Sequence, residues 1–255
     1  MSDRAALQVA ALTRRFGGIA AVNNVGFAVA EGEMLALIGP NGAGKSTCFN
    51  MIGGQLRPSS GRISLFGRDA DGLGPRAICR AGVGRTFQIT ATFASMTVRE
   101  NVQMALLADR REAWNLWRAA RRCHIAEADK LLASVGLADQ AERAAAILAY
   151  GDLKRLELAV ALAGAPRLLL MDEPTAGMAP RERVALMRQT RTQAAETNIA
   201  VLFTEHDMDV VFGVADRIVV LNRGELIAEG TGDQIRANAR VREVYLGSGA
   251  TSGGH

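Results

Sequence analysis

The sequence has few of the residues that define secreted or metal-rich proteins. Its 255 residues include three cysteines and three histidines. Cys48, Cys79 and Cys123 are far apart and form no C-x-x-C pair, which predicts reduced, half-buried thiols and no disulfide framework. Three histidines are too few for a His-rich metal site.

Long apolar runs and a secretion signal are also missing. The most apolar window, Leu158 to Met171, is interrupted by Pro166 and Arg167 and is too short to span a membrane. The first six residues lack the basic-then-apolar layout of a secretory signal. We therefore expect a cytoplasmic protein. A net charge of +4 permits contact with a membrane surface or with nucleic acid but favours neither.

What the chain does have is enough apolar sequence for a large core and one glycine-rich motif. With 49% hydrophobic residues, it suits one large α/β domain, alone or with a subdomain. An apolar run over 34–38 leads into the motif, and a segment of helical character, 47–52, follows it. The motif, called the phosphate loop below, is Gly39, Pro40, Asn41, Gly42, Ala43, Gly44, Lys45 and Ser46.

The phosphate loop fits the pattern G-x-x-x-x-G-K-[ST] in its required setting of strand, turn and helix. Glycines let successive backbone N–H groups converge on a polyanion, and the helix N-terminus adds a positive dipole end. Lys45 is expected to reach the β- and γ-phosphates, and Ser46 to offer its hydroxyl to Mg²⁺. Thr47 is a further candidate for nucleotide binding. The alternative is a glycine-rich turn that binds nothing.

The remaining pattern predicts strands at both ends of the chain and helices between them. Alternation in Leu7, Val9 and Ala11, and again in Val25, Phe27 and Val29, predicts strands. Further strands are expected at 62–66, 83–87, 168–171, 199–203 and 217–221. Helices are expected from Pro75, over 181–196, near Met208 and over 234–245, with a turn at 222–225. We predict one domain over 1–247 with a helical insertion at about 89–164, and a disordered tail at 248–255.

The helical insertion is predicted from spacing. Ala128, Leu131, Leu132 and Val135 fall at i, i+3, i+4 and i+7, which is one face of a helix.

Two adjacent carboxylates, Asp172 and Glu173, follow the apolar run 168–171. Doubly wound sheets bind ligands at the carboxyl ends of their strands, where these side chains would emerge. Asp172 is expected to hold Mg²⁺, and Glu173 to orient and deprotonate the water that attacks the γ-phosphate. The alternative is a loop whose acidic pair caps the next helix.

Together these motifs resemble the nucleotide-binding subunit of an ATP-binding-cassette (ABC) transporter. The resemblance implies an α/β fold, the P-loop ABC ATPase, with a RecA-like core, an antiparallel β subdomain and an α-helical insertion. It implies ATP and Mg²⁺ as ligands. It places Gln88 where the family senses Mg²⁺ and the attacking water, His206 where the family contacts the γ-phosphate, and Phe16 where an aromatic ring stacks on adenine.

The family's L-S-G-G-Q segment differs here. Leu148 is followed by Ala149, Tyr150, Gly151 and Asp152; residues 148–152 are called the signature segment below. By the resemblance, this segment binds the nucleotide held by the partner subunit. Ala149 offers no hydroxyl, so backbone N–H groups and the helix dipole remain for that phosphate. Ala179 also stands where an aspartate or asparagine is usual.

The L-A-Y-G form is similar to that of the larger ATPase of branched-chain (hydrophobic) amino acid importers. This implies a peripheral protein on the inner face of the membrane, working with transmembrane permease subunits. A second ATPase subunit, identical or merely similar, would complete the dimer, and a periplasmic binding protein would act indirectly. The solute is open, with urea, amides and other amino acids as alternatives.

Two alternatives from other classes fit the motifs of this chain less well. A nucleic-acid-associated ABC ATPase would carry a long coiled-coil insertion or a second cassette, so we expect no nucleic-acid partner. A small-molecule kinase would need neither the signature segment nor His206.

Two stretches leave their roles open. Residues 89–96 lie where importers of this family receive a permease helix; Phe93 and Met96 either contact it or pack inward. The aromatic and basic residues of 114–122 are either the faces of one helix or a contact for lipid head groups or the permease. They are Trp114, Trp117, Arg118, Arg121 and Arg122.

Overall fold

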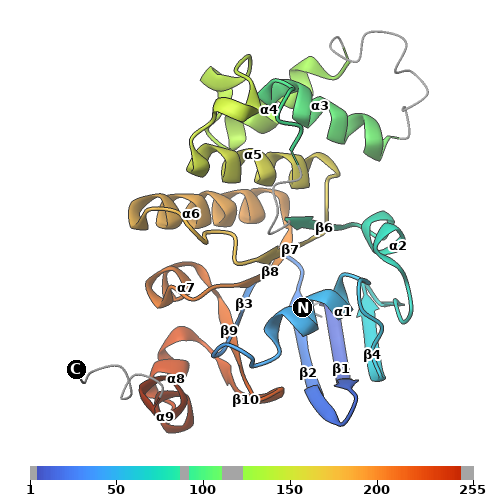
Figure 1. Ribbon diagram of the computed structural model, residues 1–255, viewed down its shortest axis with the longest axis vertical. Coiled ribbons are helices and arrows are strands. Elements are labelled where there is room, and N and C mark those ends of the chain that lie inside the picture. The colour runs from blue at the N-terminus through green and yellow to red at the C-terminus, as the bar shows by residue number, and fades with distance from the viewer. Residues whose placement is uncertain (1–4, 87–91, 111–122, 248–255) are drawn as a thin grey trace.

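A computed structural model describes residues 5–86, 92–110 and 123–247, with the backbone alone described for 245–247 (Figure 1). Ten strands are described: β1 (Ala5–Phe16), β2 (Ile19–Ala30), β3 (Met34–Ile38), β4 (Ser60–Leu65), β5 (Arg68–Asp69), β6 (Val83–Thr86), β7 (Leu168–Asp172), β8 (Ala200–Thr204), β9 (Arg217–Asn222) and β10 (Glu225–Gly230). The described α-helices are α1 (Lys45–Ile52), α2 (Pro75–Arg80), α3 (Val98–Asp109), α4 (Ile125–Ser134), α5 (Tyr150–Ala163), α6 (Pro180–Thr197), α7 (Met208–Val214), α8 (Gly232–Ala237) and α9 (Ala239–Gly247). Two 3₁₀ turns are η3 (Ala138–Gln140) and η4 (Ala145–Ile147).

The strands form two sheets. The larger sheet has the order β10-β9-β3-β8-β7-β6, and its strands are parallel except for β10, which pairs antiparallel at one edge. The smaller sheet has the order β2-β1-β4-β5 and is antiparallel. Strands β3, β7 and β8 are buried along their whole length. Such continuous apolar strands are typical of a parallel sheet that is covered on both faces.

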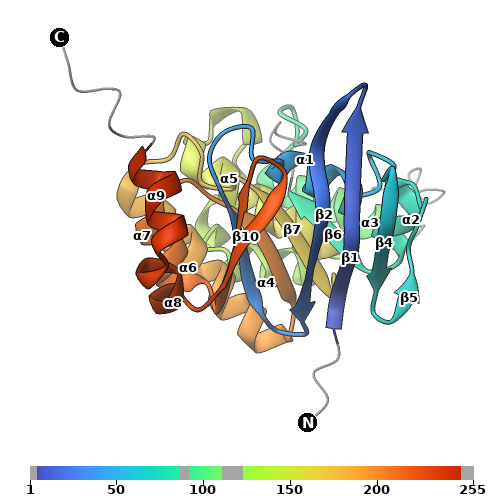
Figure 2. The same cartoon turned by 90° about the horizontal axis from the view of Figure 1, so that it is seen from below.

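The two faces of the larger sheet carry different layers (Figures 1 and 2). Alternate residues of a strand point to opposite faces. Leu35 and Leu37 of β3 therefore belong to one buried cluster, with α1 and the smaller sheet, while Ala36 and Ile38 belong to a second cluster that extends through α3 to α8. Because the phosphate loop connects β3 directly to α1, it lies between the larger sheet and the layer that contains α1.

All described regular elements between β6 and β7 are helical. The predicted face of α4 is confirmed, since Ala128, Leu132 and Val135 are buried and Leu131 packs beside them. Helix α3 begins at a capping box in which Thr97 and Glu100 satisfy each other's backbone N–H groups. The start of the predicted insertion, 89–91, and the Trp/Arg residues of 114–122 lie outside the described residues.

Several predicted boundaries are wrong. The last helix, expected over 234–245, is two helices that separate at Asn238, whose extended backbone ends α8 and whose side chain accepts a hydrogen bond from Val241 N–H at 3.2 Å. The predicted alternation fails at Ala11, an exposed residue with φ of +51° beside a register shift. Strand β4 ends at Leu65 because Phe66 turns the chain with φ of +53°, and the short β5 was not predicted.

The cysteine prediction is right about oxidation and only partly right about burial. All three thiols are free; Cys48 is buried, Cys79 exposed and Cys123 intermediate. No described helix is both long and apolar enough to cross a membrane.

Candidate active site

The phosphate loop has a backbone path that only glycine allows at two positions. Gly39 has φ of +154° and Gly44 has φ of +102°. A Cβ on Gly39 would lie 2.2 Å from the carbonyl oxygen of Leu221, and one on Gly44 would lie 2.5 Å from that of Ala21. Neither backbone atom can move aside cheaply, so the loop is pressed against β9 and β2 and depends on these glycines.

Lys45 is buried in the loop, at 6% exposure. Its Nζ donates to the carbonyl oxygens of Gly39 at 2.8 Å and Pro40 at 3.2 Å. Burial lowers the pKa of Lys45, and the negative charges of Glu173 and Asp172 oppose that shift. The ammonium therefore lies within the field of both carboxylates predicted from the sequence.

Helix α1 starts at this lysine without a side-chain cap. Its first N–H groups are therefore available to an anion. Ser46 is exposed and Thr47 half-buried in that first turn, and Asn41 and Gly42 are exposed at the tip of the loop.

Asp172 ends β7 as a buried carboxylate. Its Oδ1 accepts a hydrogen bond from Thr204 Oγ1 at 2.8 Å, and its Oδ2 lies 3.8 Å from Nη2 of Arg85. Within the described ranges, no three His, Cys, Asp or Glu side chains gather as a metal site. One carboxylate and a serine hydroxyl do fit Mg²⁺, which usually keeps several waters and shares its coordination with substrate phosphates.

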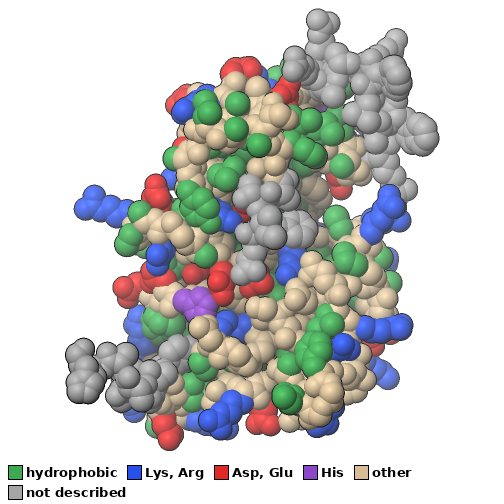
Figure 3. All heavy atoms as spheres, viewed as in Figure 1, with side chains coloured by type: hydrophobic (Ala, Val, Ile, Leu, Met, Phe, Trp, Pro, Cys, Tyr) green, Lys and Arg blue, Asp and Glu red, His purple; other side chains and the backbone are tan. Residues whose placement is uncertain are grey.

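Glu173 and His206 meet at the ends of two adjacent strands. Oε1 of Glu173 lies 2.7 Å from Nε2 of His206. The backbone N–H of Glu173 donates to Thr204 Oγ1 at 2.9 Å. Lys45, Asp172, Glu173 and His206 are therefore brought to one edge of the larger sheet. On the face drawn in Figure 3, acidic and basic side chains and a histidine lie close together near the middle of the molecule.

The signature segment leads into α5, on the opposite face of the larger sheet from α1. Ala149 is the N-cap without a side-chain hydrogen bond, and Gly151 is buried. The Tyr150 hydroxyl donates to Ala176 O at 3.0 Å, and Asp152 accepts from Gln140 at 2.7 Å. Among the described residues, no hydrogen bond or ion pair joins this segment to the phosphate loop, so one chain does not bring the two together.

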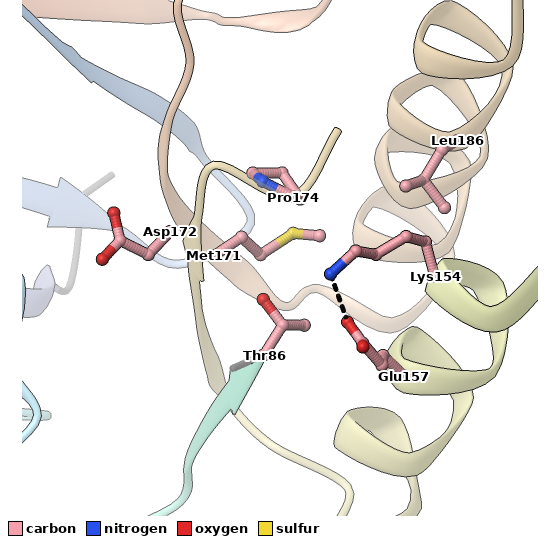
Figure 4. Close-up of a pocket in the computed structure, with 7 residues that line it drawn as sticks. All are labelled: Thr86, Lys154, Glu157, Met171, Asp172, Pro174 and Leu186. Carbon is pink, nitrogen blue, oxygen red and sulfur yellow. Dashed lines mark hydrogen bonds and ion pairs between the residues drawn. The ribbon is translucent and has the colours of Figure 1, made fainter. Parts of the chain in front are cut away.

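A small cavity separates α5 from the ends of β6 and β7. Its volume is about 10 Å³, room for roughly one water molecule. Lys154 Nζ donates to Glu157 Oε2 at 3.0 Å, both side chains being buried, while Glu157 Oε1 has no partner among the described residues. Figure 4 shows the Asp172 carboxylate pointing away from this pair. The cavity thus lies where α5 and α6 meet the end of β7, and Asp172 is one of the residues that line it.

Two other predicted residues are not part of this described group. Phe16 ends β1 with 49% of its surface exposed, and the Arg14 guanidinium lies 4.8 Å from its ring centre. Gln88 lies outside the described residues.

The sequence reasoning missed the residues that support the acidic pair. Thr204 and Glu205 directly precede His206, and Thr175 follows Glu173 by two positions, so proximity in sequence was the available signal. Arg85, three residues before Gln88, is held by hydrogen bonds to Asn50 at 3.0 Å and to Gln55. Burial lowers its pKa, and the Asp172 carboxylate opposes that effect.

A glycine-rich loop with a buried lysine, a strand-end carboxylate and a second carboxylate paired with histidine are the features of a P-loop nucleotide hydrolase. A family model described as ABC transporter matches residues 22–176, and one described as branched-chain amino acid ATP-binding cassette transporter matches 225–251. The chain belongs to the ABC transporter family and has its ATPase fold.

Known relatives match over almost the whole chain. One is the high-affinity branched-chain amino acid transport ATP-binding protein BraF of Pseudomonas aeruginosa, 41% identical over 96% of this chain and 99% of BraF. The ADP conformation of MJ1267, an ATP-binding cassette of an ABC transporter, is 29% identical with a TM-score of 0.85 over 95% of this chain and 99% of that one. A dimeric post-hydrolysis structure of the cassette MJ0796, bound to ADP and Pi, is 26% identical with a TM-score of 0.73 over 88% and 98%.

Proposed function

We propose that this chain is the MgATP-hydrolysing subunit of an ABC importer for branched-chain or related amino acids. The observation that carries the catalytic part is the Glu173–His206 pair, 2.7 Å apart and beside the buried Lys45. The solute class is supported by the 41% identity to BraF over nearly the full length of both chains. Import of another small solute, such as urea or an amide, is the alternative.

The first chemical task is to hold the triphosphate. The N–H groups of the phosphate loop and of the first turn of α1 point at the phosphates, and Lys45 leaves its carbonyl partners to contact the β- and γ-groups. Asp172, Ser46 and Gln88 would hold Mg²⁺, which neutralises charge that develops on the phosphates. Phe16 offers the free face of its ring to adenine, because Arg14 lies over the ring.

Hydrolysis requires a base that points at the attacking water. Glu173 accepts the water's proton, since its carboxylate stands at the strand end beside Lys45. His206 keeps that carboxylate in place and contacts the γ-phosphate. Its Nε2 is the atom that bonds Glu173, so binding of the phosphate would rearrange this contact.

The site needs a second subunit. Ala149, Tyr150, Gly151 and Asp152 lie on another face of the sheet, so these residues would serve the nucleotide of a partner ATPase, identical or similar. The dimeric arrangement of MJ0796 supports this proposal.

Coupling to transport places the helical part against a membrane permease. Within one domain of residues 1–247, the subdomain at about 89–164 is the part that moves, on the inner face of the membrane. Phe93, with 53% of its surface exposed, is a candidate contact for the permease. A periplasmic binding protein would deliver the solute, and nucleic acid is not a partner.

Replacing Glu173 by Gln tests the mechanism. The variant keeps the size of the side chain but cannot accept a proton, so hydrolysis should fall by about 10²–10⁴. ATP binding should persist, and MgATP should increase dimer formation as seen by light scattering. Hydrolysis within a few-fold of wild type would exclude Glu173 as the base. Lost hydrolysis without MgATP-dependent association would keep the base and count against a homodimer, and repeating the measurement with the cognate partner ATPase would decide between partners.

The solute is tested in a strain that lacks the chromosomal copy of this chain. Uptake of radiolabelled leucine should depend on the wild-type chain and fail with Glu173→Gln. Uptake that is unaffected by the deletion would direct the search to urea and amides.

A further inference from the structure

The backbone of Glu173 has a conformation that needs support from its surroundings. Its φ is +50°, in the left-handed region that residues other than glycine seldom adopt. The next residue is Pro174, whose ring further restricts the conformation of the residue before it. Such a backbone persists where neighbouring contacts hold it, and these residues concentrate at active sites.

The turn after Glu173 is held by a buried carboxylate from the next strand. Ala176 N–H donates to Glu173 O at 3.1 Å, which closes the turn. Inside the turn, the N–H and hydroxyl of Thr175 both donate to Oε1 of Glu205, at 3.0 and 2.7 Å. Thr175 is 1% exposed and Glu205 5%. This contact is therefore shielded from water and joins the ends of β7 and β8.

Glu205 also contacts the other member of the catalytic pair. Its Oε2 accepts from the backbone N–H of His206 at 3.3 Å. No ion pair of the described residues includes Glu205, and burial raises its pKa against the opposing effect of these hydrogen bonds. A buried carboxylate without a cation is costly, so its three contacts are the compensation that the structure provides.

We propose that Glu205, acting through Thr175, is a positioning residue that keeps Glu173 and His206 within hydrogen-bond distance. The inference rests on the proposed function only for its catalytic consequence. Thr175 fixes the turn in which Glu173 stands, and Glu205 fixes the backbone of His206. Loss of either contact would let the two side chains separate while the phosphate loop, on other elements, keeps its shape.

Thr175→Val and Thr175→Ser form the central pair of variants. Valine keeps the shape of the side chain and removes the hydroxyl, whereas serine keeps the hydroxyl and removes a methyl group. Thr192→Val is the matched control, since Thr192 is an exposed threonine of α6 whose hydroxyl donates to Arg188 O at 3.2 Å. Glu205→Leu removes all three contacts.

The first measurement uses the ligand-free chain and needs no activity. With only three histidines, the imidazole nitrogen signals can be assigned by NMR, using His206→Ala as reference. Thr175→Val and Glu205→Leu should shift the His206 Nε2 signal toward its position in Glu173→Gln. Thr175→Ser and Thr192→Val should leave it unchanged. An unchanged His206 signal in folded Thr175→Val would overturn the proposal, even if Glu205→Leu failed to fold.

The second measurement separates positioning from general damage. Thr175→Val should lower kcat for ATP hydrolysis by about tenfold, as expected for one buried hydrogen bond, and change KM less than about twofold. Thr175→Ser should restore kcat. Loss of ATP affinity together with kcat, without rescue by serine, would contradict positioning. Equal rates of ATP hydrolysis in Glu173→Gln and wild type would refute the proposed function. The NMR result would still decide the present inference.

Discussion

Two neighbouring regions are supported in different ways: the strand ends of the candidate site, called the fixed half below, and the Lys154–Glu157 pair where α5 joins β7, called the jointed half. At the ends of β7 and β8, hydroxyl groups make the short contacts to the carboxylates: Thr204 bonds Asp172 at 2.8 Å, and Thr175 bonds Glu205 at 2.7 Å, while the Arg85 guanidinium lies farther from Asp172, at 3.8 Å. In the middle of α5, the buried carboxylate of Glu157 pairs with a cation, Lys154, at 3.0 Å, beside a small cavity.

The two regions differ in how specifically their contacts are directed. Hydroxyl and N–H donors between adjacent strands give directional contacts at the strand ends, as catalysis requires. An ion pair within one helix, with Glu157 Oε1 unpartnered among the described residues, leaves the contact of α5 with β7 less specified.

Lys45→Ala, in the phosphate loop beside the fixed half, should have the largest effect. The change removes the positive charge that faces the phosphates, so ATP binding should become undetectable in a titration. Lys130→Ala, at an exposed position of α4, is the control and should bind normally. Near-normal affinity in Lys45→Ala would show that the phosphate loop does not hold the nucleotide.

The jointed half should respond strongly to Glu157→Leu. Removing one partner of a buried ion pair leaves an uncompensated charge and typically costs about 3–5 kcal/mol of unfolding free energy. The double variant Lys154→Met/Glu157→Leu should regain most of this, because apolar replacements of both partners are often neutral. Urea denaturation measures both. Equal loss in the single and double variants would mean that packing, not charge, holds α5 there.

Site residues that belong to short contiguous motifs could be predicted from the sequence, whereas contacts between distant residues could not. Lys45, Ser46 and the acidic pair belong to short motifs next to apolar runs, so their elements could be predicted. Contacts such as Thr175 with Glu205 join residues 30 positions apart, and nothing in the linear pattern pairs them. The break at Asn238 was missed because helical residues continue on both sides, and only the extended backbone there separates α8 from α9.

Tyr150→Phe should have a smaller effect on the free energy of unfolding, and it tests the contact between the signature segment and the loop after β7. The tyrosine ring lies against Gly177, where an added Cβ would come within 3.2 Å, and the hydroxyl bonds Ala176 O. Loss of this single hydrogen bond should lower the unfolding free energy by about 0.5–1.5 kcal/mol. Ile147→Val, at a nearby position with 62% exposure, should change it little. Equal stability of Tyr150→Phe and wild type would indicate that this hydrogen bond does not hold the signature segment against the loop of Ala176 and Gly177.

The smallest effect concerns how the fixed half responds to pH, and Glu205→Gln isolates it. Burial raises the pKa of Glu205 above its ordinary value of 4.5. Below pH 4.5 the residue is protonated in both states, so it adds no pH dependence. Between pH 4.5 and the raised pKa, it ionises in the unfolded chain alone, which favours unfolding; above that pKa the cost is constant. The stability of wild type relative to Glu205→Gln should therefore be lower at pH 7 than at pH 4, as measured by urea denaturation at both values. The amide still offers an oxygen to Thr175, so the comparison removes the charge and retains that contact. A difference that is the same at both pH values would mean that Glu205 titrates normally, and that its three hydrogen bonds fully offset its burial.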